Sequence, residues 1–168
     1  MAALSMCDQL LASDNKINKL NILKLKAGAQ SSIGSVYEEQ GNYAEALKYN
    51  EEALKIRQET GDKPGLAASY NNIGNIYADQ GNNPKALKFF LAGLKIKEEI
   101  GDKKSISISY NNIGSLYYYQ GDYAQALKYH AAALRLRRQI GDKSGIAASY
   151  NNIGIIYDDK GDYSQSLK

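Results

Sequence analysis

The chain has 168 residues, of which 23% are charged, and its formal net charge is only +3 at pH 7. This bias is too weak for nucleic-acid binding, which needs Lys and Arg clustered on one face, and no apolar run approaches the ~20 residues of a membrane span. The single cysteine, Cys7, excludes an internal disulfide and fits a reducing compartment. We therefore expect a cytoplasmic protein with no nucleic-acid or membrane partner.

The hexapeptide Ser-Tyr-Asn-Asn-Ile-Gly occurs at 69–74, 109–114 and 149–154, and a worn copy ends at Gly34. The copies are 40 residues apart, and a fixed period in this range indicates an array of structural repeats. Residues 1–23 do not align with the repeats, and their leucines have helical spacing. We predict that 1–23 form a degenerate N-terminal capping helix and that 24–168 form the repeat array.

Each repeat is predicted to contain two helices, in units of about 24–61, 62–101, 102–141 and 142–168. In the second unit we expect helices over about 64–80 and 84–100, with Asp62 as the N-cap of the first. Gly81 and Gly101 stand where these helices should end. A loop of two or three residues between two helices makes an antiparallel helical hairpin.

The last unit stops soon after its second helix begins. Ile153 and Tyr157 are therefore expected to lack the apolar face that covers their copies in the other units. We expect the sequence to be a fragment of a longer array, because natural arrays finish with a polar capping helix.

Helical phase predicts which side chains meet between the two helices. Large residues on one helix face small ones on the other, as close helix packing requires. The predicted core residues are Tyr70, Ile73, Gly74 and Tyr77 on the first helix and Ala86, Phe90, Gly93 and Leu94 on the second, with the copies Ile113, Gly114, Tyr117, Ala126, Ala133 and Leu134.

This pattern closely resembles the tetratricopeptide repeat signature, although the usual period of that repeat is about 34 residues. The longer unit resembles the repeats of kinesin light chains, of Pins-type adaptors and of bacterial sensor proteins. The resemblance implies an all-α fold, a right-handed superhelix of helix-turn-helix repeats. It also implies that the opposite face of each first helix lines a concave groove for peptides.

We call this opposite face the groove face. It consists of Asn71, Asn72, Asn75, Asp79, Asn111, Asn112, Tyr118, Tyr119, Asn151, Asn152, Asp158 and Asp159, together with the copies Ala68, Ala78, Ile108, Ser115, Ala148 and Ile155. Asparagine can donate and accept at once, so these amides suit the backbone of an extended peptide. The tyrosines suit hydrophobic anchoring, and the carboxylates should favour peptides that carry Lys or Arg.

One other interpretation of the asparagines remains open, and a second is not favoured. One asparagine of each pair could bond within the array, since duplication alone would copy it. Asn72, Asn75 and Asn112 also match the asparagines with which chaperone adaptors of the resembled family hold a C-terminal carboxylate, but the matching lysine positions hold Ala, Ile or Asn. We therefore expect no carboxylate clamp.

The residue pattern gives no support for catalysis. His130, the only histidine, replaces Phe90 and is interpreted as a partly buried packing residue. Cys7 and His130 cannot form a metal site alone, so we expect no enzyme, cofactor or metal. The preferred function is a scaffold that binds a protein or peptide segment, within a larger signalling or adaptor protein. The alternatives are a homo-oligomer formed through the incomplete last repeat and a sensor for a small ligand.

Overall fold

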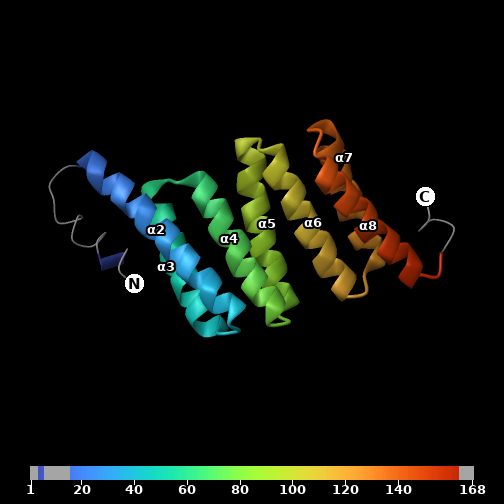
Figure 1. The fold of residues 1–168 in the computed structure, drawn as a ribbon, viewed down its shortest axis with the longest axis horizontal. Coiled ribbons are helices and arrows are strands. Elements are labelled where there is room, and N and C mark those ends of the chain that lie inside the picture. Colours follow the sequence, from blue (N-terminus) through green and yellow to red (C-terminus); the bar gives the residue numbers. More distant parts are fainter. Residues whose placement is uncertain (1–3, 6–15, 163–168) are drawn as a thin grey trace. The chain divides into compact units, whose positions relative to one another are not determined.

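The computed structural model describes residues 4–5 and 16–162, with the side chains of 16–18 excepted. Between residues 16 and 162 the chain forms seven helices joined by short loops (Figure 1). They are α2 (Lys16–Glu39), α3 (Tyr43–Thr60), α4 (Lys63–Asp79), α5 (Asn83–Ile100), α6 (Lys103–Tyr119), α7 (Tyr123–Gln139) and α8 (Lys143–Asp159). The prediction of an all-α chain built from helix-turn-helix repeats is confirmed.

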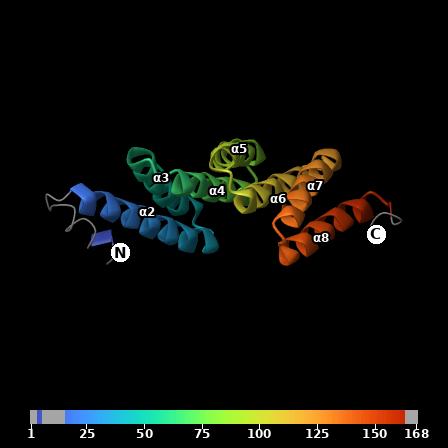
Figure 2. The same cartoon turned by 90° about the horizontal axis from the view of Figure 1, so that it is seen from above.

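The chain divides into two compact units, Met1–Ile96 and Lys97–Lys168, and the boundary lies near the end of α5. In the first unit α3 packs against both α2 and α4, and in the second unit α7 packs against both α6 and α8. Figures 1 and 2 show these neighbours side by side within each unit. Short loops join them, so neighbouring helices run antiparallel.

The helix ends follow the sequence signals closely. Asp62 caps α4 by accepting a hydrogen bond from the Gly65 backbone N–H at 3.1 Å, and Asp142 accepts from the Gly145 N–H at 2.9 Å. The seven glycines in the loops all have φ between 67° and 79°, the left-handed conformation that side chains with a Cβ rarely adopt. The helices predicted over 64–80 and 84–100 are therefore observed within one residue of their expected bounds.

The first helix begins earlier than the repeat pattern suggested. α2 runs without interruption from Lys16 to Glu39, across the expected boundary between residues 23 and 24. Residues 16–23 thus extend the first helix of the first repeat, and most of the predicted capping helix lies outside the described residues. The proposed division into 1–23 and 24–168 stays a prediction.

The predicted core contacts form through glycines that face rings. A Cβ added to Gly74 would lie 2.6 Å from the Cδ1 and Cε1 atoms of Phe90, and one added to Gly114 would lie 3.0 Å from the ring of His130. Ile73 and Ile113 are fully buried. The glycines therefore set how closely each first helix approaches the next second helix.

The predicted tyrosines and Leu134 are only half-buried. The tyrosines instead stack on rings at a position that the helical phase did not include. Tyr77 stacks on Phe89 with ring centroids 5.4 Å apart, and Tyr117 stacks on Tyr129 at 5.6 Å. This second layer of rings covers the edge of the core in both units.

Candidate functional site

In the second unit the groove face contains a chain of polar contacts. Asn152 on α8 donates from Nδ2 to Asn111 Oδ1 on α6 at 3.0 Å, and Arg137 Nη1 on α7 approaches the same oxygen at 3.5 Å. Arg137 also donates to Ser149 Oγ at 2.7 Å and to the Gly145 carbonyl at 3.0 Å. These bonds tie three helices together beneath the groove face.

In the first unit the corresponding asparagine bonds differently. Asn72 on α4 donates from Nδ2 to Asn50 Oδ1 on α3 at 3.3 Å, and Asn50 is fully buried. Asn50 in turn donates to the Ala46 carbonyl at 3.0 Å. Asn72 and Asn152 therefore each donate an amide hydrogen bond to another residue of the array. This is what the interpretation in which one asparagine of each pair bonds within the array requires.

These contacts give one prediction that separates the two asparagines of a pair. Asn152→Ala should destabilise the chain by about 1 kcal/mol, because it removes the bond to Asn111. Asn151 is exposed, so Asn151→Ala should change the free energy of unfolding by less than about 0.5 kcal/mol. Urea denaturation of both variants measures the difference, and equal effects would contradict a structural role for Asn152.

A basic residue recurs at the end of each second helix, half-buried in Arg57 and buried in Lys97 and Arg137, and the repeat pattern did not predict its burial. Arg57 donates to Ser69 Oγ at 2.6 Å, and Lys97 donates to Ser109 Oγ at 2.7 Å. Arg137 and Ser149 make the third pair of this kind. Burial lowers the pKa of all three bases. The sequence did contain one signal for it: each base lies seven residues after the repeat position held by Asn50, Phe90 and His130, on the same helical face.

His130 is buried more completely than predicted. Its side chain is 1% exposed, and its Nδ1 atom has no hydrogen-bond partner. Burial, and then the neighbouring Arg137, lowers the pKa of His130 to about 4. The imidazole is therefore neutral at physiological pH and takes the packing place of Phe90, as its position in the repeat indicated.

Several groove-face residues of the second unit meet at one cavity of about 290 Å³. We call this cavity the Tyr118 pocket, and it is lined by Ser115, Tyr118, Tyr119, His130, Asn152 and Ile155. Tyr118 and Tyr119 meet edge to face with ring centroids 5.4 Å apart. Tyr118 also donates its hydroxyl to Asp159 Oδ2 at 2.6 Å, which places a carboxylate beside the rings.

The other predicted site residues lie at the surface or partly buried. Asp79, Asn151 and Asp158 are exposed, whereas Asn71, Asn75 and Asn112 are half-buried. In the first unit the acidic groups are crowded together. Burial, followed by the nearby carboxylates of Asp79 and Glu39, raises the pKa of Glu38.

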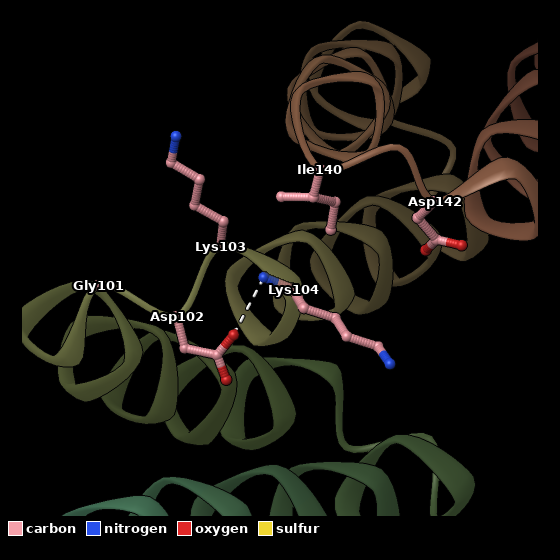
Figure 3. A pocket seen from close by; sticks show the side chains of 6 residues that line it. All are labelled: Gly101, Asp102, Lys103, Lys104, Ile140 and Asp142. Atoms are coloured by element: carbon pink, nitrogen blue, oxygen red, sulfur yellow. Dashed lines mark hydrogen bonds between the residues drawn. The ribbon is translucent and has the colours of Figure 1, made fainter.

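A second cavity of the second unit, of about 590 Å³, lies where α6 begins. Its lining residues are Gly101, Asp102, Lys103, Lys104, Ile140 and Asp142. Figure 3 shows the side chains of Lys103 and Lys104 extending in different directions, while Asp102 accepts the Lys104 backbone N–H at 3.1 Å. The charges do not converge on a common point, so we do not assign a site here.

The described part of the chain carries neither a membrane span nor a metal centre. No helix there is long and apolar enough to cross a membrane. Among the same residues, no three His, Cys, Asp or Glu side chains are grouped so that they could hold a metal ion. Cys7 lies outside the described residues.

Comparisons with known proteins agree on the fold. BtubC from P. vanneervenii matches 98% of this chain at 20% identity and a TM-score of 0.80, over 66% of its own chain. The apo form of RapI matches 99% at 20% identity and a TM-score of 0.81, over 45% of its chain. A signal transduction ATPase with a tetratricopeptide repeat sensor, from Pyrococcus horikoshii, matches 98% at 20% identity and a TM-score of 0.79, over 27% of its chain.

The chain therefore spans less than two thirds of each of these structures. No curated protein matches it. The family model described as "Tetratricopeptide repeat" matches residues 25–99 and 105–168, which is most of the sequence. Together with the helix pairs, the glycine-to-ring contacts and the 40-residue period, this match shows that the chain belongs to the tetratricopeptide repeat family.

Proposed function

We propose that this chain binds a peptide or protein segment on its groove face, as part of a larger adaptor or signalling protein. Tetratricopeptide repeats generally mediate protein–protein interaction, which sets the class of partner. The observation that carries the proposal is the Tyr118 pocket. Five of its six lining residues belong to the groove face, the side of the first helices that helical phase places opposite the core.

The charges of the groove face support a basic partner. Asp158 is exposed, and Asp159 stands beside the Tyr118 pocket. In the first unit burial, and then the carboxylates of Asp79 and Glu39, raise the pKa of Glu38, so a cation placed there would relieve the repulsion between these carboxylates. Complementary charge sets partner choice and association rate more than affinity, so the segment is expected to contain Lys or Arg.

The test uses a random library of capped hexapeptides with the whole 168-residue chain as bait. The wild-type chain should retain peptides enriched in Lys and Arg. The double variant Asp158→Lys, Asp159→Lys should retain acidic peptides instead, while its helicity and melting stay close to those of the wild type. Retention of no peptide at any concentration tested would refute the proposal.

Association of two copies is the second candidate function. Ile153 and Gly154 are only half-buried, whereas Ile73, Gly74 and their copies in α6 are buried. This leaves an apolar strip on α8 that another copy could cover. Measuring the mass of the free chain across the concentrations used for the library separates the candidates, because a constant monomer mass excludes self-association.

A further inference from the structure

The Tyr118 pocket is large enough to hold one amino-acid side chain. Its volume of about 290 Å³ lies at the lower limit of small-molecule pockets, which measure roughly 300–1,000 Å³. It is far larger than the ~30 Å³ that one water molecule occupies in the liquid. The cavity can therefore admit a large side chain from an otherwise surface-bound segment.

The lining favours an uncharged aromatic side chain. The walls combine the two tyrosine rings with Ile155, and both Tyr119 and Ile155 present apolar surface to solvent at 79% and 42% exposure. None of the six lining residues carries a charge at neutral pH, because His130 is held neutral by burial and by Arg137. Aromatic pairs favour the edge-to-face and offset arrangements that these walls allow.

The aromatic walls are a departure from the repeat. The positions of Tyr118 and Tyr119 hold Glu38 and Glu39, Ala78 and Asp79, and Asp158 and Asp159 in the other repeats. Residues that build the helix pairs recur every 40 positions, whereas these tyrosines do not. Since Tyr119 is mostly exposed, core packing does not account for it, and tyrosine is enriched where interfaces concentrate their binding energy.

We infer that the Tyr118 pocket holds one aromatic side chain of the bound segment and that Asp159, at its edge, pairs with a basic residue next to that side chain. This inference rests on the proposed function and specifies its partner: a segment in which Phe or Tyr adjoins Lys or Arg. The carboxylate is already fixed by the Tyr118 hydroxyl at 2.6 Å, so it loses little side-chain freedom on pairing.

The experiment uses capped hexapeptides in which one position is fixed in turn as Phe, Tyr, Leu, Ala, Lys or Glu, with binding to the whole chain measured by fluorescence polarisation. At one position Phe or Tyr should strengthen binding at least about tenfold over Ala, because a large apolar side chain leaves water there. At an adjacent position Lys should bind better than Glu, and the preference should weaken with added salt.

Substitutions in and away from the Tyr118 pocket test whether this pocket causes the preference for an aromatic peptide side chain. Ser115→Ile fills the pocket with the residue that occupies the same repeat position at Ile155, and it should remove the aromatic preference. Ser35→Ile makes the same change at the equivalent position of α2 and should leave that preference intact. Tyr119 is 79% exposed, so Tyr119→Ala should weaken the binding of aromatic peptides severalfold without changing the melting temperature of the chain.

The outcomes separate this inference from the proposed function. Peptide binding without an aromatic preference, or an aromatic preference that survives Ser115→Ile in a folded chain, would overturn the assignment of the pocket alone. Failure of the wild-type chain to bind any peptide would overturn both.

Discussion

Replacing Gly74 by Leu should destabilise the chain by more than about 2 kcal/mol. A Cβ at this position would already lie 2.6 Å from two ring carbons of Phe90, and overpacking of this kind costs about 1–3 kcal/mol or more. The ring cannot simply move aside, because Phe90 is 4% exposed and enclosed by the core. Gly114→Leu should behave in the same way against His130.

Gly28 supplies the matched control for this substitution. It lies inside α2, and a Cβ there would meet nothing within 4 Å. Gly28→Leu should therefore stabilise the chain slightly, since Leu favours helix by up to about 1 kcal/mol over Gly. Thermal and urea denaturation of both variants measure the contrast, and a Gly74→Leu melting temperature equal to that of the wild type would disprove the close-contact role.

A double substitution tests whether the clash is with the ring itself. Phe90→Ala alone should cost about 3–5 kcal/mol through the cavity it leaves. In the presence of Gly74→Leu, however, the new side chain can occupy part of that cavity. The combined loss should therefore be smaller than the sum of the two single losses by at least about 0.5 kcal/mol, the usual sign of contacting residues.

The fold was predictable because each repeat contains residues that mark where its helices begin and end. Asp62 and the loop glycines mark the bounds of α4 and α5, and the 40-residue period extended the same interpretation to the other helices. Helical phase placed Gly74 and Phe90 on the two faces that meet, and the period placed Gly114 and His130 on the same faces of the next repeat. The contact of each glycine with one particular ring came from the structure. Local signals sufficed because neighbouring helices are joined by tight turns.

The polar contacts of the candidate site were less predictable. Arg57, Lys97 and Arg137 resemble ordinary basic residues in the last turn of a helix, but each donates a hydrogen bond to a serine twelve residues further along the chain. The bond from Tyr118 to Asp159 joins residues 41 positions apart. Composition and helical phase place such residues on a face, but which pairs touch depends on how neighbouring helices pack.

His130 should make the chain sensitive to acid. Its pKa is lowered from 6.5 to about 4 in the folded chain, chiefly by burial and then by Arg137. Between these values the unfolded chain binds a proton that the folded chain excludes. The contribution of His130 to the free energy of unfolding is therefore constant above pH 6.5, and it destabilises the folded chain increasingly as the pH falls towards 4. The free energy of unfolding falls by about 3 kcal/mol in total through this titration.

His130→Phe should remove this loss, because it installs the residue that the preceding repeat carries at Phe90. The same substitution eliminates a buried Nδ1 atom that lacks a hydrogen-bond partner, so it should also stabilise the chain at neutral pH by about 1 kcal/mol or more. Urea denaturation of both chains at ~pH 7.5 and ~pH 4.5 measures the two effects. The other acidic and basic groups are common to both chains, so the difference in their pH dependence isolates the imidazole. If wild type and variant lose stability in parallel between these pH values, His130 is protonated as readily in the folded chain as in the unfolded one, and its burial against Gly114 and Arg137 does not control its charge.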